Sequence, residues 1–154
     1  MKVMVTVDGS ECADLAIDAI VGRVWHDNDE FLVLSVMEPL PMEFSFLRNG
    51  ESENASENNL HNQFEYITDY AAKRIREAIP GHDVSTEVAK GPVASTIVDT
   101  ASQWGADLIV MASHGRSGFQ RILLGSVTHE VIKLAHCSVE VIKKPAQSFL
   151  DCIR

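Results

Sequence analysis

The sequence has few basic residues for its size. Its 154 residues include 13 Lys and Arg against 22 Asp and Glu, which gives a formal net charge of −9. Proteins that bind nucleic acid broadly carry a basic face, and anionic membrane surfaces also attract basic segments, so we expect neither as a partner. A small anion remains compatible with this charge, because backbone N–H groups and helix N-termini bind anions without a net positive charge.

The sequence also lacks a long apolar segment. No stretch approaches the roughly 18 uninterrupted apolar residues of a membrane span. The opening residues, MKVMVTVD, alternate as a strand does and reach Asp8 before an apolar core of useful length, which argues against a signal peptide. We therefore expect a cytoplasmic protein.

Cysteine and histidine form no recognisable disulfide or metal pattern. Cys12, Cys137 and Cys152 are odd in number and include no C-x-x-C pair, so free thiols are expected. Cys137 follows His136, but neighbouring residues entering a strand point to opposite faces, so we expect Cys137 to be buried packing. His129 and His136 lie seven apart on one predicted helix without further ligands, which favours a surface or capping role over metal binding.

Five short apolar or alternating segments predict β-strands. They cover residues 2–7, 31–36, 84–89, 107–112 and 138–144. Between them lie four helical patterns. The first has Ser10 as its N-cap and apolar residues at Ala13, Ala16, Ile17, Ile20, Val21 and Val24. The second runs from Leu60 to Ala78, the third begins with Pro92 as its first helical residue, and the fourth opens at Gly125-Ser126.

This alternation of strand and helix implies an α/β fold. Such a pattern predicts a parallel sheet with helices on both faces and right-handed crossovers. Neither an internal repeat nor a second domain is apparent, so we expect one domain over residues 1–144 and a C-terminal tail over residues 145–154. Residues 43–59 are rich in Asn, Ser and Glu, which predicts a mobile loop.

Two predicted strands end in residues suited to a ligand. The first strand ends in Val7-Asp8-Gly9-Ser10, and the fourth runs into Met111-Ala112-Ser113-His114-Gly115. In an open α/β sheet, ligands bind at the carboxyl ends of the strands, where the strand order reverses. If these two strands are neighbours, both segments face one crevice.

The segment from Gly115 to Ser126 has the composition of a phosphate-binding loop. Gly115 and Gly118 permit positive φ and close approach of a ligand to the backbone. The helix that starts at Gly125-Ser126 presents unsatisfied N–H groups, and Ser126 adds a hydroxyl donor. Asp8 can accept ribose hydroxyls or hold a divalent cation together with the phosphates. Short glycine motifs are weak evidence, so plain turns and an ordinary helix start are an equal alternative at this point.

The chain resembles the universal stress protein family over roughly residues 2–144. The family's ATP-binding signature is G-x-x-G, nine residues, then G-S or G-T, and here Ala112-Ser113-His114-Gly115 precedes nine residues and Gly125-Ser126. The segments VTVDGSECA, LSVMEP and HCSVEVIKK are also similar to that family. The resemblance implies an open five-stranded sheet of order 3-2-1-4-5, Rossmann-like, and a homodimer formed through the last strand, residues 139–143.

The resemblance also implies a site for an adenine nucleotide, ATP or else AMP or ADP. The chemistry of Asp8 allows Mg or Mn to accompany the nucleotide, with Asp8 as a ligand of the metal. Asp8 would lie near ribose and phosphate, and Val7 would wall the pocket. Val36 would meet adenine through its backbone, and Met111 and Ala112 would flank adenine and ribose. The phosphate side would be formed by His114 and Gly115 and by the N–H groups of Gly125, Ser126 and Val127, with the Ser126 hydroxyl.

These observations favour a cytoplasmic, homodimeric nucleotide sensor or store of the stress response. No G-x-x-x-x-G-K-[ST] occurs, so fast ATP turnover is not expected, although a slow ATPase is an alternative. A second alternative is a dimeric interaction module with an empty pocket, because Ala112 replaces the first glycine of the signature. A receiver domain is disfavoured, because its third strand would lead to an Asp and here leads to Ala89-Lys90-Gly91.

The roles of three charged or titratable residues in this segment stay open. His114 suits a loop position near phosphate better than a general base, because no nucleophile lies at a recognisable spacing. Arg116 and Arg121 are equally compatible with phosphate contacts and with solvated loop charges.

Overall fold

Five parallel strands form one sheet, in the order β3-β2-β1-β4-β5. The computed structural model describes residues 1–38, 53–114 and 124–143. Along the chain, the elements are β1 (Lys2–Thr6), α1 (Glu11–Val21), β2 (Glu30–Met37), α2 (Glu53–Ala78), β3 (Asp83–Lys90), α3 (Val93–Trp104), β4 (Leu108–Ala112), α4 (Ser126–Leu134) and β5 (Ser138–Ile142). The predicted α/β class and strand order are confirmed, and β1 and β4 are neighbours.

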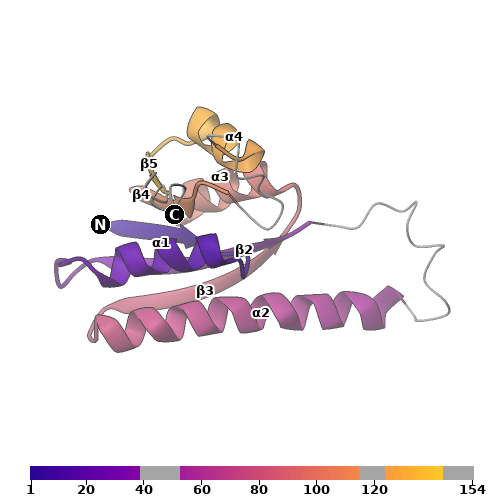
Figure 1. The fold of residues 1–154 in the computed structure, drawn as a ribbon, viewed down its shortest axis with the longest axis horizontal. Coiled ribbons are helices and arrows are strands. Elements are labelled where there is room, and N and C mark those ends of the chain that lie inside the picture. The colour runs from indigo at the N-terminus through magenta and orange to yellow at the C-terminus, as the bar shows by residue number, and fades with distance from the viewer. Residues whose placement is uncertain (39–52, 115–123, 144–154) are drawn as a thin grey trace, which may run out of the picture.

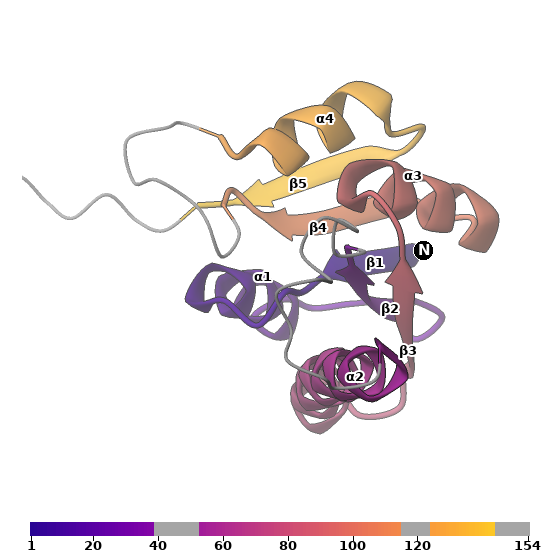
Figure 2. The same cartoon turned by 90° about the vertical axis from the view of Figure 1, so that its right-hand side faces the viewer.

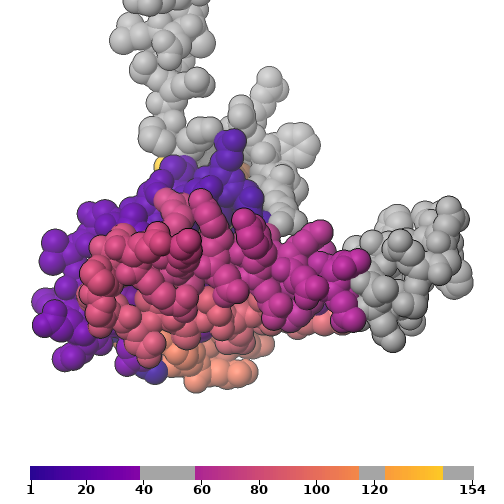
Figure 3. Space-filling model, turned by 90° about the horizontal axis from the view of Figure 1, so that it is seen from below, coloured from indigo at the N-terminus to yellow at the C-terminus, as the bar shows by residue number. Residues whose placement is uncertain are grey.

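Helices cover both faces of the sheet. Figures 1 and 2 show α1 and α2 on one side and α3 and α4 on the other. Seen from the side of α2, this long helix runs across much of the molecular surface (Figure 3). A parallel sheet needs this arrangement, because each crossover helix buries one of its two faces.

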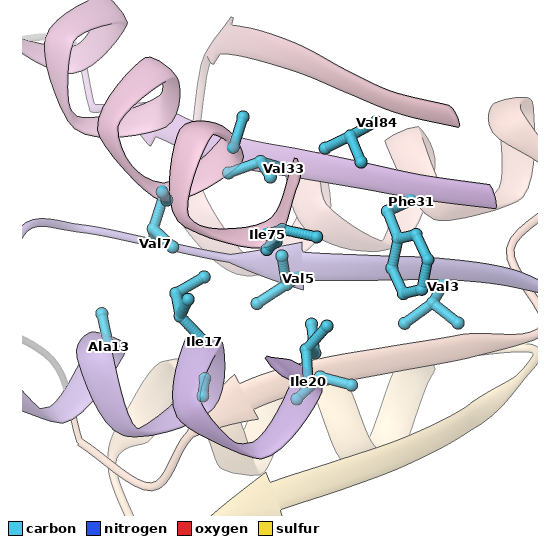
Figure 4. Close-up of a cluster of buried hydrophobic side chains, with 14 residues drawn as sticks. Val3, Val5, Val7, Ala13, Ile17, Ile20, Phe31, Val33, Ile75 and Val84 are labelled. Atoms are coloured by element: carbon cyan, nitrogen blue, oxygen red, sulfur yellow. The ribbon is translucent and has the colours of Figure 1, made fainter. Parts of the chain in front are cut away.

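Successive side chains of the central strand β1 enter opposite cores. Val3 and Val5 are fully buried against α1 and α2, in a cluster that includes Ile17, Phe31 and Ile75 (Figure 4). Met4 lies between them and joins the second cluster, with residues of α3 and α4. The period of two in a strand therefore supplies both apolar layers from one short apolar segment.

The sheet places the carboxyl ends of β1 and β4 side by side at the point where the strand order reverses. From β1 the chain continues to β2 and β3 on one side of the sheet, and β4 and β5 are added on the other side of β1. The crossover helices of the two halves therefore separate between β1 and β4. Figure 2 shows α1 and α2 diverging from α3 and α4 across the sheet.

Three sequence-based boundaries were wrong. The mobile loop predicted over residues 43–59 extends too far, because α2 already begins at Glu53; the remaining part, up to residue 52, lies outside the described residues. Extending an existing helix by one residue costs little free energy, so α2 continues into a polar segment whose composition alone predicts a loop. Val24 is fully exposed rather than part of the first helical stripe, because α1 ends before Gly22, where a helical glycine would cost about 1 kcal/mol. Pro92 is the N-cap of α3, one residue before its predicted place.

Within the described part of the chain, no helix combines the length and hydrophobicity that crossing a membrane requires.

Candidate functional site

A cavity of about 760 Å³ lies at the carboxyl ends of the strands. Nine of the ten predicted site residues line it: Val7, Asp8, Val36, Met111, Ala112, His114, Gly125, Ser126 and Val127. Gly115, the tenth, lies outside the described residues, as do Gly118, Arg116 and Arg121. The tertiary structure therefore brings together side chains from the ends of three strands and the start of α4.

The turn after β1 holds the Asp8 carboxylate at the cavity wall. The Oδ1 atom of Asp8 accepts hydrogen bonds from the backbone N–H of Ser10 at 3.0 Å and from its hydroxyl at 2.6 Å. Gly9 between them has φ 76°, a conformation that side-chain-bearing residues rarely adopt. The Ser10 hydroxyl also accepts from the N–H of Ala13 at 3.2 Å, so the predicted N-cap is confirmed. One hydroxyl thus orients the carboxylate and caps α1.

The end of β2 turns a backbone N–H and C=O toward the region beyond β1. The Val7 N–H donates to the carbonyl of Leu34 at 2.9 Å, whereas the carbonyl of Met37 accepts from Gly91 next to β3 at 3.1 Å. Because alternate residues of a parallel strand bond to opposite neighbours, Val36 faces the same side as Leu34. In a regular parallel ladder the Val36 N–H would bond to the carbonyl of Val7. In this structure that carbonyl accepts from the Ser35 hydroxyl at 2.6 Å. Val36 itself lines the cavity, and the strand geometry directs its N–H and C=O to the β1 side.

The beginning of α4 is fixed against the end of β4. The Gly125 N–H donates to the carbonyl of Ser113 at 2.8 Å, and the Thr128 hydroxyl donates to the carbonyl of Ala112 at 3.1 Å. In this structure the carbonyl of Ser113 already accepts the Gly125 N–H, which was predicted to hold phosphate together with those of Ser126 and Val127. Helix geometry leaves the N–H groups of residues 126–128 without an intrahelical acceptor, and these groups form the positive end of the α4 dipole.

Ser113 links this corner to β5 and to His114. Its N–H donates to the carbonyl of Ile142 at 2.8 Å, and its hydroxyl lies 3.1 Å from the Nδ1 atom of His114. Ser113 is 4% exposed, whereas His114 lines the cavity. The imidazole is thus held by a buried hydroxyl at the wall.

Ala112 fits its position without backbone strain. No described residue other than glycine has a positive φ, so the backbone at residue 112 does not need glycine. Ala112 is one of the residues that line the cavity.

The lining also contains residues that the sequence pattern did not assign to a site. They are Thr6, Ala13, Leu34, Glu38, Leu60, Phe64, Val93, Ile97, Leu124, Thr128 and His129. Apart from Leu124, the apolar ones belong to segments predicted as strand or helical stripe, and periodicity cannot separate a core contact from a cavity wall. Glu38 had a usable signal, since it lies two residues after the predicted strand 31–36, at the same edge of the sheet.

No group of three or more metal-ligand side chains occurs among the residues that the structure describes. Asp8 and Glu38 are the acidic side chains of the described lining. A cation at this place would need oxygen ligands from elsewhere, such as phosphates or water, because Mg²⁺ requires near-octahedral oxygen coordination.

Comparison with known proteins identifies the family. The profile of the Universal stress protein family matches residues 1–143. The chain belongs to this family. Universal stress protein MJ0577 of Methanocaldococcus jannaschii is 29% identical over 153 residues, which cover 93% of this chain and 94% of the relative. MJ0531 of the same organism is 52% identical over 65 residues, but that match covers 42% of this chain and only 38% of the relative.

Solved structures of universal stress proteins share the fold. The structure of MJ0577 has a TM-score of 0.81 at 29% identity and covers 95% of this chain and 97% of its own. An Arabidopsis thaliana family protein with AMP bound has a TM-score of 0.67 at 17% identity, covering 95% of this chain and 93% of its own. A universal stress protein in complex with cAMP has a TM-score of 0.64 at 22% identity, covering 92% and 95%. Because these last two proteins are less than 25% identical to this chain, their similarity shows a shared fold only.

Proposed function

We propose that the cavity binds an adenine nucleotide and that the protein acts as a nucleotide sensor or store in the stress response. The observation that carries the proposal is the convergence of Asp8, the Val36 backbone and the α4 N-terminus in one cavity of about 760 Å³. This volume lies within the usual range of roughly 300–1,000 Å³ for small-molecule sites. The AMP and cAMP bound by neighbours of the same fold support an adenine nucleotide as the ligand.

Each part of the nucleotide has a matching group in the lining. The N–H and C=O of Val36 can pair with the acceptor and donor on the adenine edge, while Met111 and Ala112 flank the base and ribose. The Asp8 carboxylate accepts the ribose hydroxyls. The phosphates bind at the open N–H groups of residues 126–128 and at the Ser126 hydroxyl, where the helix dipole favours anions. Gly125 contributes by letting α4 approach β4 closely.

A divalent cation, Mg²⁺ or Mn²⁺, would enter with the phosphates and take Asp8 as its protein ligand. The carboxylate oxygens of Asp8 and Glu38 are hard donors that suit such a cation. When bound, the cation would neutralise phosphate charge next to an acidic protein.

Thermal unfolding tests the proposal. Protein freed of nucleotide is heated with ATP, ADP or AMP at millimolar concentration, and the midpoint should rise with ligand concentration as mass action requires. An Asp8→Ala variant should show a smaller rise. Protein purified without added nucleotide is also denatured, and the released absorbance at 260 nm is read. No shift with any of the three nucleotides, together with no released adenine, would reject nucleotide binding.

A dimeric interaction module with an empty pocket is the competing function. Its support is the Ala112 methyl group on the cavity wall, where the family signature has glycine. The Ala112→Gly variant separates the two functions. Under nucleotide binding, wild-type protein already shifts with ATP; under the competing function, only the variant or neither protein does.

We propose further that the protein is a homodimer that pairs through residues 139–143. In the described sheet β5 is an edge strand, and such an edge has unpaired backbone groups. Ile132 and Leu134 of the neighbouring α4 are 45% and 49% exposed, so apolar surface accompanies this edge. Light scattering should give about twice the chain mass of 17.0 kDa. A mass equal to one chain at micromolar concentration would contradict the dimer.

A further inference from the structure

Two histidines determine how positive the described cavity wall can become. His114 reaches the cavity from the end of β4, and His129 from α4. Among the lining residues that the structure describes there is neither lysine nor arginine, and Asp8 and Glu38 carry negative charge. The two imidazoles are therefore the side chains of this described lining that are able to carry a positive charge.

His129 lies one turn from the start of α4. Its backbone N–H donates to the carbonyl of Gly125 at 2.9 Å, which is the first hydrogen bond of the helix. His129 is exposed and is one of the residues that line the cavity, whereas the hydroxyl of neighbouring Thr128 points to the carbonyls of β4. His129 thus lines the same cavity as residues 126–128, whose open N–H groups are where the proposed function places the phosphates.

The other helices around the cavity contribute no charged residue to its described lining. The lining residues from α1, α2 and α3 are apolar: Ala13, Leu60, Phe64, Val93 and Ile97. On α4 itself, Glu130 is next to His129 and Lys133 lies one turn further on. One of these two side chains is acidic and the other basic, so their charges offset each other. From the strands, the charged or titratable lining residues are Asp8, Glu38 and His114.

We propose that His129 makes the site pH-responsive and selective for polyphosphate: its protonated form strengthens ATP binding, and strengthens AMP binding less. The inference rests on the proposed nucleotide function and adds a regulating residue to it. The protein has a formal net charge of −9, which opposes the binding of an anion, so a positive charge next to the phosphates should raise the affinity for ATP. By linkage, ATP binding near neutral pH must also take up protons to the same degree that protonation favours ATP.

The decisive experiment compares four proteins at pH 6 and pH 8. Dissociation constants of ATP and AMP are measured by titration calorimetry at constant ionic strength, with EDTA present, for the wild type, H129Q, H129K and H136Q. ATP itself gains a proton in this range, but this contribution is the same for every protein and cancels when the pH 8 to pH 6 ratios are compared. His136 is the matched control, because it follows the same helix and does not line the cavity.

The ratio of the ATP dissociation constant at pH 8 to that at pH 6 should be about three- to tenfold larger for the wild type than for H129Q. For AMP, the difference between the two proteins should be smaller. H129K, which keeps its charge, should bind ATP more tightly than H129Q at pH 8 and should show a pH 8 to pH 6 ratio close to that of H129Q. H136Q should behave as the wild type. Calorimetry of the wild type in two buffers of different ionisation enthalpy should show proton uptake with ATP, and less uptake in H129Q.

Four results would overturn the inference. A wild-type ATP ratio retained in H129Q, or equal effects on ATP and AMP, would show that His129 does not respond to the phosphates while nucleotide binding stands. If neither His129 variant folds, the absence of ATP-linked proton uptake in the wild type would have the same meaning. Failure of the wild type to bind either nucleotide at both pH values would instead reject the proposed function and this inference with it.

Discussion

The N–H of Gly125 donates to the carbonyl oxygen of Ser113 at 2.8 Å, and a Cβ placed on Gly125 would lie only 3.1 Å from that same oxygen. The φ of −67° at Gly125 suits any residue, so glycine is required here for close approach and not for backbone conformation. This contact sets how near the start of α4 comes to the end of β4, and therefore where the open N–H groups of α4 lie at the cavity.

Replacing Gly125 with alanine should weaken nucleotide binding more than it weakens the fold. The methyl group must push α4 from β4 by a few tenths of an ångström, which misplaces the phosphate donors. We expect ATP affinity to fall about tenfold, or about 1.4 kcal/mol. Titration calorimetry measures the affinity, and chemical denaturation measures the free energy of unfolding.

Gly22→Ala is the matched control for this variant. A Cβ on Gly22 would lie 3.1 Å from the carbonyl oxygen of Asp18, the same clearance, but Gly22 does not line the cavity. Both variants are expected to change stability by similar amounts, and only Gly125→Ala is expected to change affinity. Equal affinities for the two variants would contradict the role assigned to Gly125.

Replacing Ser10 with alanine should affect both stability and binding. The variant loses the α1 cap to Ala13 and the hydroxyl bond to Asp8. Loss of a cap costs about 1 kcal/mol, and a less restrained carboxylate should bind ribose more weakly. Urea denaturation and ATP titration measure the two effects.

Ser10→Thr and Ser95→Ala provide the controls. Threonine keeps the hydroxyl, so it should preserve most of both properties. Ser95 lies in the first turn of α3 and donates to the carbonyl of Pro92 without capping the helix, so its loss should cost less than about 0.5 kcal/mol. If Ser10→Ala matched Ser95→Ala in both assays, the double role of the Ser10 hydroxyl would be wrong.

Glu140 of β5 should stabilise the fold only above acidic pH. Hydrogen bonds from both terminal nitrogens of Arg23, one of them 2.6 Å long, lower the pKa of Glu140, while partial burial opposes them. A carboxylate with a lowered folded-state pKa adds stability above its unfolded pKa of about 4.3, and this stability disappears as pH falls through the folded value. Since Arg23 and Glu140 are 39% and 32% exposed, the contribution is expected near 0.5 kcal/mol.

The measurement compares Glu140→Gln with the wild type by urea denaturation at pH 7 and pH 3. The wild type should be more stable at pH 7 and lose that advantage by about pH 3. Glu87→Gln on the opposite edge strand is the control, because no ion pair of Glu87 is recorded within the described ranges. An advantage that persists undiminished at pH 3 would argue against the ionic nature of the contact.

Cys137 should react slowly with thiol reagents in the folded protein. Cys137 is half-buried against the α3 and α4 cluster, so the predicted buried packing is confirmed in part. Burial raises the pKa of the Cys137 thiol, which lowers the fraction of reactive thiolate at neutral pH. Peptide mapping after iodoacetamide treatment at pH 7 should show at least about tenfold slower labelling than in urea. Equal rates in the two states would show that neither burial nor the raised pKa protects this thiol.

The sequence by itself determined the elements and much of the chemistry at their ends. Apolar spacing predicted five strands and four helices, and Ser10 was identified as a cap because capping involves only residues a few positions apart. The ends of β1 and β4 were singled out because glycine, serine and aspartate follow directly on apolar segments. The strand order was known only through resemblance to a family, since periodicity does not specify which strands pair.

Only the tertiary structure decided which residues share the cavity. Leu60 and Phe64 follow the same helical period as core residues, and His129 has the local pattern of a surface residue, yet all three line the cavity. Likewise, only the packing of α4 against β4 engages the Gly125 N–H with Ser113. Local sequence sets φ and ψ preferences over a few residues. The convergence of distant segments depends instead on strand order and helix packing, which arise from contacts across the whole chain.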